Sequence, residues 1–262
     1  MTTQGIDVSM YQGNIDFKKV KASGYTFVII RMNNWDNVKR CNVIDPYFNV
    51  NYNNAKAAGL NVGAYFFTNA NTLEYVDVEL SLCKSILKGK SFEYPIYVDV
   101  ERRQQFDQGK QFCTKLVEKW CSGLEAFGAF AGVYCSRYWY TNFVDEKTRE
   151  RYACWIADWA STCTYKGTYG IWQDCSANVS GVSGKVDHDY CYQDYPSIIK
   201  KAGRNNWEDK QSEPNWKQMY DTLLGDYKKK EEQLTKLKEK LTKTEKEMKE
   251  AEDALKDTLK EV

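Results

Sequence analysis

The first 200 residues alternate between short apolar runs and longer segments of mixed polarity. Five apolar runs, rich in residues that favour strands, are separated by segments with helical character. The runs lie at 5–9, 25–32, 61–67, 94–101 and 131–136, and the predicted helices lie at 14–23, 45–58, 72–88, 108–127 and 137–150. Strands that alternate with helices pair in parallel through right-handed crossovers, which predicts an α/β fold.

This rhythm changes after residue 150. Three further strand-like runs, at 153–160, 169–176 and 186–193, have only loops between them. Five strand–helix units followed by three bare strands predict an eight-stranded barrel whose outer coat of helices is incomplete.

Two carboxylates close the fourth apolar run. The stretch "YPIYVDVE" contains Asp99 and ends in Glu101, two positions later. Residues i and i+2 of a strand face the same side, about 6.5–7 Å apart along the backbone. In a parallel barrel the C-terminal ends of the strands surround the active-site mouth. We therefore expect both acids to point into that mouth.

Further acids lie near the ends of other predicted strands, at Asp7, Asp158, Asp187 and Asp189. Carboxylates that share one mouth repel each other, an arrangement that catalysis or metal binding can favour and folding alone does not. The alternative is that each acid caps a loop or pairs with an arginine, for which Arg31, Arg102 and Arg103 are available.

Several other chemistries have little support. The chain has one histidine, His188, so neither a histidine-rich zinc centre nor a Ser-His-Asp triad is favoured, although a carboxylate-only calcium or magnesium site stays open. We expect no cofactor and assign no metal ligand. The net charge of +1 gives no reason to expect a nucleic-acid partner. We find no glycine-rich nucleotide motif and no apolar run of membrane-spanning length.

Aromatic residues make up 15% of the chain. Several lie near the predicted strand ends: Tyr65, Phe66, Tyr134, Tyr138, Trp155, Trp159 and Trp172. We expect some of these rings to stack on sugars and others to belong to the core. Paired carboxylates in an aromatic-lined mouth are typical of glycoside hydrolases, in which one acid protonates the leaving oxygen and the other supports positive charge at the sugar carbon.

The composition changes beyond the predicted barrel. Residues 201–215 are polar and predict a linker, and residues 216–262 predict a helical coiled-coil tail. Apolar residues recur every seven positions at Leu234, Leu241, Met248, Leu255 and Val262. This heptad pattern predicts self-association through residues 227–262. The alternative is a single solvated helix held by Glu–Lys pairs.

Five segments resemble glycoside hydrolase family 25, the muramidases (lysozymes) of many phage endolysins and some bacterial autolysins. They lie at 5–31, 61–67, 97–101, 155–160 and 171–189, in the order and spacing of that family. The resemblance implies a (β/α)5β3 TIM-like barrel as the catalytic domain, over residues 1–200. It also implies hydrolysis of the β-1,4 bond between N-acetylmuramic acid and N-acetylglucosamine in peptidoglycan.

The resemblance further implies roles for residues. Glu101 is the expected general acid, and Asp99 its partner, acting either as nucleophile or by orienting the substrate's own N-acetyl oxygen. Asp7 and Asp187 match the other two acids of the family's pocket. The expected substrate-binding residues are Tyr65, Tyr134, Tyr138, Trp159, Gln173 and Asp189. Tyr11, Phe66 and Arg31 depart from the family's more usual Trp, His and Lys.

The N-terminal residues lack the basic start and apolar stretch of a secretory signal. The nine cysteines include no C-x-x-C pair, so we expect mostly reduced thiols. Together with the resemblance, these features predict a phage endolysin that is made in the host cytoplasm and reaches the wall after the membrane is permeabilised. The alternatives are a virion-associated or bacterial autolytic hydrolase, or a non-catalytic wall-binding protein assembled through its coiled coil.

Overall fold

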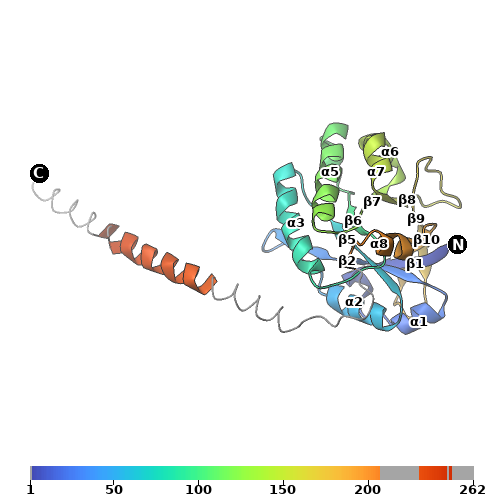
Figure 1. Ribbon diagram of the computed structural model, residues 1–262, viewed down its shortest axis with the longest axis horizontal. Helices are drawn as coiled ribbons and strands as arrows, with labels where there is room; N and C mark the ends of the chain where they lie inside the picture. Colours follow the sequence, from blue (N-terminus) through green and yellow to red (C-terminus); the bar gives the residue numbers. More distant parts are fainter. Residues whose placement is uncertain (1, 207–229, 247, 250–262) are drawn as a thin grey trace, which may run out of the picture. The chain divides into compact units, whose positions relative to one another are not determined.

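The computed structural model describes residues 2–206, 230–246, 248 and 249. Eight strands close a barrel in the order β1-β10-β9-β8-β7-β6-β5-β2 (Figure 1). These strands are β1 (Thr3–Val8), β2 (Phe27–Arg31), β5 (Asn61–Phe67), β6 (Ile96–Asp99), β7 (Ala131–Ser136), β8 (Ala153–Ala157), β9 (Ile171–Asn178) and β10 (Lys185–Cys191). All eight predicted strands and the α/β barrel are confirmed.

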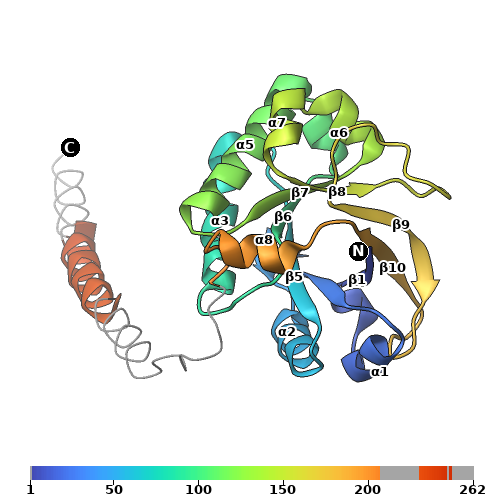
Figure 2. The same ribbon diagram turned by 45° about the vertical axis from the view of Figure 1, so that its right-hand side comes forward.

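Helices lie in the connections between the parallel strands. They are α1 (Phe17–Ala22), α2 (Phe48–Ala57), α3 (Leu73–Leu87), α5 (Lys110–Ala126), α6 (Arg137–Phe143) and α7 (Glu146–Arg151), with the short η1 (Met10–Gln12) and α4 (Arg103–Phe106). The single helix predicted at 137–150 is two helices, because Val144 and Asp145 have extended backbones between them. In Figure 2, β9 and β10 form the side of the barrel away from α3, α5 and α7.

Strand β10 runs antiparallel to both of its neighbours, β1 and β9. The other barrel pairs are parallel. The start of β10 therefore lies at the end of the barrel where the parallel strands finish. This reversal places Asp187 directly opposite Asp7 of β1.

The core has two layers, which follow from the two faces of each strand. Outward-facing side chains such as Ile6, Val28 and Val98 pack beneath the helices. Inward-facing side chains, including Phe27 and Tyr97, fill the lower barrel. The inner layer fills the barrel below its mouth, so an active site is expected at the C-terminal ends of the parallel strands.

A two-stranded hairpin after β2 was not predicted. It comprises β3 (Asn33–Asp36) and β4 (Cys41–Ile44). Polar side chains hold it: Asn33 Nδ2 donates to Asn42 Oδ1 and Asn42 Nδ2 donates to Glu79 Oε1, each at 2.8 Å. Because these strands are stabilised by side-chain amides rather than by an apolar face, the alternation of apolar residues did not indicate them.

The barrel extends beyond residue 200. Helix α8 (Tyr195–Lys201) buries Tyr195 and Ile199 in the inner core. Asn205 is buried, accepts a hydrogen bond from the backbone N–H of Phe130 at 2.7 Å and donates to the backbone oxygen of Tyr94 at 2.9 Å. The predicted linker therefore starts too early, since residues 201–206 belong to the barrel. Residues 207–215 lie outside the described residues.

Residues 230–246 form a helix. Leu234, Leu237 and Leu241 are 55%, 69% and 60% exposed on it. Self-association through residues 227–262 stays a prediction, and residues 216–229 and 250–262 of the expected tail lie outside the described residues. None of the described helices is long and apolar enough to cross a membrane.

Candidate active site

The carboxyl pair predicted at the end of the fourth strand lies at the mouth of the barrel. Strand β6 ends at Asp99, and Glu101 follows two residues later. Val98 and Val100 belong to the apolar layer beneath the helices. Alternation therefore turns Asp99 and Glu101 toward the opposite side, which is the barrel interior. Asp99 is buried and Glu101 is exposed.

The two other predicted acids join this pair. Asp7 and Asp187 are backbone partners in the β1–β10 ladder. Burial is the largest cause of the raised pKa of both Asp7 and Asp99; the charge of Asp187 adds to it for Asp7, and the charge of Glu101 adds to it for Asp99. Four carboxyl groups from three strands thus act on one another in one cluster, as the sequence predicted.

Asp189 lies deeper in the barrel than Asp187. Strand β10 starts at the mouth and runs antiparallel to its neighbours, so a residue two positions later on it lies deeper in the barrel. Asp189 is fully buried, and its Oδ1 accepts a hydrogen bond from Trp155 Nε1 at 2.7 Å. Burial raises the pKa of Asp189 well above its usual value, and the charge of Asp7 adds to this. A direct contact between Asp189 and a sugar stays a prediction.

Gln173 of β9 connects the acids to the aromatic residues. Its Nε2 donates to Asp7 Oδ2 at 2.8 Å. Its Oε1 accepts from the Tyr134 hydroxyl at 2.9 Å and from Trp159 Nε1 at 3.1 Å. Two donors at the oxygen fix the orientation of the amide, so its N–H must face Asp7. Gln173, expected to bind substrate, is buried and instead holds the Asp7 carboxyl group in place.

Burial is the main cause of the raised pKa values of the acids at the mouth. It raises the pKa of both Asp99 and Glu101, and the charge of Glu101 adds to the effect on Asp99. The guanidinium of Arg31 is the strongest opposing influence on both. Oδ1 of Asp99 is buried without a hydrogen-bond partner among the described residues. Such an orphaned acceptor costs stability, which favours a functional role for it.

Arg31 acts on the acid pair but was not among the site residues predicted from the sequence. It ends β2, and its Nε donates to the backbone oxygen of Asn33 at 2.8 Å, which directs the guanidinium. The signal was present in the sequence, where a charged residue closes the apolar run "FVIIR". The position matches that of Asp99 on β6, since both residues end a parallel barrel strand.

The predicted aromatic residues fall into a buried pair and an exposed pair. Tyr65 and Tyr134 are 8% exposed, and their rings lie 5.8 and 4.4 Å from that of Trp155, centroid to centroid. Tyr138 and Trp159 are 58% and 61% exposed. The buried tyrosines thus line the floor of the mouth, and the exposed rings offer flat apolar faces of the kind that sugars stack on.

Three residues considered from the sequence lie elsewhere. Asp158 accepts hydrogen bonds from Arg137 Nε at 3.1 Å and from the backbone N–H of Thr164 at 2.7 Å, which matches the alternative of a loop-capping acid. Phe66 and Trp172 belong to the outer core. The strand-end position alone therefore did not separate site residues from structural ones.

Asp7 gives the site a measurable pH dependence of stability. Burial first, and the charge of Asp187 second, raise the pKa of Asp7 to about 8. The unfolded chain releases this proton near 3.8. Between these values the folded state binds more protons, so the free energy of unfolding falls as pH rises. The slope for one such group is at most about 1.4 kcal/mol per pH unit.

Asp7→Asn is therefore expected to be more stable than the wild type at neutral pH. The Asn Oδ1 can still accept from Gln173 Nε2, while the cost of keeping a buried acid protonated at neutral pH is removed. Urea unfolding at ~pH 7.5 and ~pH 4 should show an advantage for the variant that shrinks as pH falls. Asp16→Asn is the control, because the exposed Asp16 has a lowered pKa, caused chiefly by the backbone N–H of Lys19. An Asp7→Asn variant less stable than the wild type at neutral pH would contradict this account.

Comparison with known families identifies the group to which this barrel belongs. The sequence profile of Glycosyl hydrolases family 25 matches residues 6–182, more than half of the chain. The chain belongs to glycosyl hydrolase family 25. The match includes Asp7, Asp99 and Glu101 and ends before β10, which carries Asp187.

Two curated lysozymes are similar to this family-25 chain. The autolytic lysozyme of Clostridium acetobutylicum is 28% identical over 197 residues, which cover 71% of this chain and 55% of that protein. Lysozyme M1 of Streptomyces globisporus is 43% identical over 68 residues, covering 26% of this chain and 21% of that protein. The chain thus spans about half, or less, of the length of these relatives.

Solved structures share the family-25 barrel. The CTP1L endolysin superposes with a TM-score of 0.63 and 25% identity, over 76% of this chain and 70% of that one. The lysozyme of Streptomyces coelicolor superposes with a TM-score of 0.60 and 22% identity, over 78% and 97%. At 22% identity, the similarity to the Streptomyces coelicolor lysozyme shows a shared fold and nothing more.

Proposed function

We propose that this chain is a peptidoglycan muramidase, which hydrolyses the β-1,4 bond between N-acetylmuramic acid and N-acetylglucosamine. The observation that carries the proposal is the acid cluster. Asp99 and Glu101 turn to one side of β6 at the mouth of a barrel whose lower part is filled, with Asp7 and Asp187 beside them. Membership of family 25, and similarity to two lysozymes, support this substrate class.

Glu101 is assigned as the general acid. It is the exposed member of the pair, so it can meet a glycosidic oxygen and recover its proton from solvent. Although the residue is partly open to solvent, the groups packed around its carboxyl take it out of bulk water and raise its pKa, which keeps a donor proton available closer to neutral pH. Protonation of the leaving oxygen breaks the bond, and the ionised Glu101 can then take a proton from the water that attacks the sugar carbon.

Asp99 is assigned as the group that supports positive charge at the sugar carbon. It lies below Glu101, and Arg31 favours its ionised form against the effects of burial and of the charge of Glu101. Burial raises the pKa of Asp99 well above its usual value, which favours its protonated form in the free chain. Positive charge that develops at the sugar carbon favours the ionised form, and a proton kept on Glu101 lowers the repulsion that this ionised form meets. Asp99 acts either by attack on the sugar or by orienting the N-acetyl oxygen that attacks in its place.

Asp7 and Gln173 tune this pair rather than react. The bond from Gln173 fixes the Asp7 carboxyl group, and the charge of Asp7 raises the pKa of Asp99. The exposed rings of Trp159 and Tyr138 are assigned to sugar stacking. Because Trp159 also donates to Gln173, a sugar on that ring would lie next to the group that holds Asp7.

The decisive experiment is digestion of purified peptidoglycan, followed by mass spectrometry of the new reducing ends. Reducing muramic acid ends are expected. Reducing glucosamine ends would make the enzyme a glucosaminidase, and cut peptides would reject glycoside hydrolysis. Binding without any cleavage would favour the alternative of a non-catalytic wall-binding protein.

Proteins similar to this chain have two kinds of biological role, as endolysins and as autolytic enzymes. The CTP1L endolysin and the autolytic lysozyme of Clostridium acetobutylicum are both similar to this chain. A role as a phage endolysin is our preferred interpretation, and a role as a bacterial autolysin is the alternative.

A further inference from the structure

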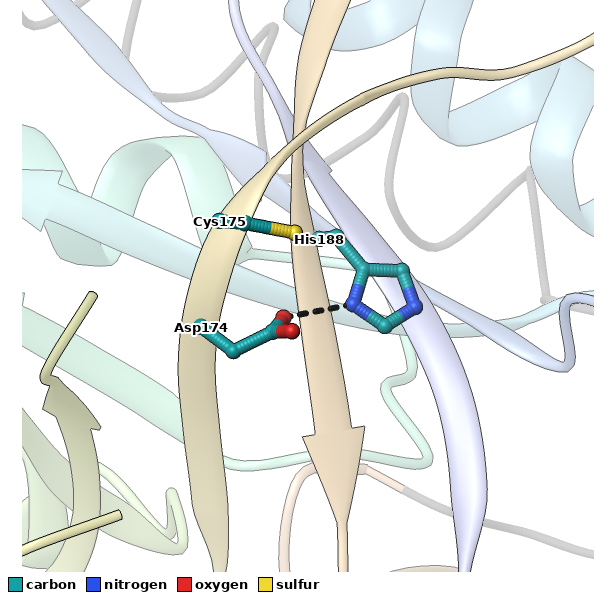
Figure 3. Close-up of side chains that lie close together, drawn as sticks. All are labelled: Asp174, Cys175 and His188. Carbon is teal, nitrogen blue, oxygen red and sulfur yellow. Dashed lines mark hydrogen bonds and ion pairs between the residues drawn. The ribbon is translucent and has the colours of Figure 1, made fainter. Parts of the chain in front are cut away.

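A second cluster of reactive side chains lies on the other face of the strands that carry the acids. The side chains of Asp187 and Asp189 of β10 face the barrel interior, so His188 between them points to the outer face of the barrel. There it lies beside Asp174 and Cys175 of β9 (Figure 3). None of these three residues has a role in the proposed hydrolysis.

A β-bulge brings the three side chains together. In the β9–β10 ladder, His188 pairs with Cys175 and the next residue, Asp189, pairs with Gln173. Asp174 is therefore an extra residue without a partner. Consecutive side chains of a regular strand point to opposite faces, but a bulge re-aims them. Figure 3 shows the Asp174 carboxylate and the Cys175 sulfur both directed toward His188.

We propose that Asp174, Cys175 and His188 bind one divalent cation of the zinc class and so clamp β9 to β10. One oxygen, one sulfur and one nitrogen ligand atom lie within 4.8 Å of one another. In a tetrahedral zinc site such atoms are about 3.3–3.6 Å apart, as bond lengths of about 2.0–2.3 Å require. Small side-chain movements would reach that geometry and leave a fourth position for water.

The surroundings of His188 match those of a metal-binding histidine. Its Nδ1 lies 2.6 Å from Asp174 Oδ1 and its Nε2 lies 3.3 Å from Gln4 Oε1. Both ring nitrogens thus face oxygen acceptors, and a neutral imidazole has one N–H for the two. A cation on Nδ1, with the proton on Nε2 donated to Gln4, satisfies both contacts. Metal-binding histidines usually donate their second N–H in this way.

The position of the cluster also suits a structural metal. The rings of Tyr25 and Tyr190 lie edge-on to His188, with centroids at 5.8 and 4.7 Å, and His188 is buried. Strand β9 carries Gln173 and β10 carries Asp187, so a clamp between the strands would stiffen one wall of the acid cluster. The cation is expected to raise stability and to take no part in hydrolysis.

Calorimetric titration of the full chain with Zn²⁺, after chelator treatment and with thiols kept reduced, tests the proposal. One Zn²⁺ per chain and a raised melting temperature are expected. Replacement of Zn²⁺ by Co²⁺ should give a sulfur-to-cobalt charge-transfer absorption. Cys175→Ser should abolish that absorption and weaken Zn²⁺ binding by at least about tenfold. Cys163→Ser is the matched control, because Cys163 is also a partly exposed free thiol but lies outside the cluster.

Two further variants keep the test decisive if Cys175→Ser does not fold. Asp174→Asn should weaken Zn²⁺ binding while it preserves the size of the side chain. Gln4→Ala, at an exposed position, should weaken binding by about tenfold through the histidine alone. Absence of stoichiometric Zn²⁺ binding by the wild type would overturn the proposal. Binding that is unchanged in Cys175→Ser and Asp174→Asn would overturn it as well.

Discussion

Glu101→Gln is expected to reduce the rate of peptidoglycan hydrolysis by about 10²- to 10⁴-fold while the protein stays folded. Glutamine keeps the size of the side chain but has no proton to give to the leaving oxygen. The exposed position of Glu101 makes misfolding an unlikely cause of the loss. Release of reducing sugar from purified peptidoglycan, together with circular dichroism of the same sample, measures both quantities.

The pH profile makes this test specific. Because burial raises the pKa of Glu101, the wild type should lose activity on the alkaline side as the donor proton dissociates. The residual activity of Glu101→Gln should lack that dependence. Glu74→Gln is the matched control, since Glu74 is an exposed acid in the first turn of α3, outside the cluster. Full activity in Glu101→Gln would show that another group donates the proton.

The period-two alternation of strands explains why the acid pair could be predicted. Val98 and Val100 had to face the helices, so Asp99 and Glu101 had to face the mouth. This inference uses one strand and no knowledge of its neighbours. Tyr97, on the same side of the strand, lies in the barrel interior below the acids.

Depth inside the barrel could not be predicted in the same way. Asp187 and Asp189 share a face of β10, but only the antiparallel direction of that strand makes Asp189 the deeper residue. The role of Gln173 likewise depends on partners from β1, β7 and the loop after β8. Such contacts join residues far apart in the sequence, and no local pattern encodes them.

The cluster of Asp174, Cys175 and His188 could not be predicted from the sequence either. A lone histidine argued against a zinc centre, and the spacing of Asp174, Cys175 and His188 matches no common motif. The bulge that gathers them is an irregularity in the pairing of β9 with β10. Regular alternation would place the side chains of Asp174 and Cys175 on opposite faces of the strand. A prediction based on alternation therefore could not identify this cluster.

The inner face of the barrel shows how a functional site is accommodated in a stable fold. The lower interior is filled mainly by aromatic and aliphatic side chains, and Asp7, Asp99, Glu101 and Asp187 lie above it at the mouth. There, buried carboxyl groups with raised pKa values reduce stability at neutral pH. The cluster is thus better explained by catalysis than by folding, which is why substitutions in it should separate activity from stability.

Asp99→Asn is expected to lower the hydrolysis rate by about 10²-fold or more, because the amide cannot carry the negative charge that supports the sugar cation. The variant should be at least as stable as the wild type near neutral pH, since burial, the main cause, raises the pKa of Asp99 well above its usual value. Reducing-sugar release and urea unfolding of one preparation test both expectations. Asp158→Asn is the matched control, because Asp158 also follows a barrel strand but pairs with Arg137 outside the cluster.

The two chemical roles open to Asp99 differ in what they require of the substrate. If Asp99 attacks the sugar carbon itself, the wild type should still cleave glycan whose N-acetyl groups have been removed. If Asp99 orients the N-acetyl oxygen, that glycan should resist cleavage while the acetylated glycan is hydrolysed. The orphaned Oδ1 of Asp99 is the acceptor that an N-acetyl N–H would need, so we expect the deacetylated glycan to resist. Equal rates on both glycans would assign Asp99 as the nucleophile. Full activity of Asp99→Asn would exclude both roles.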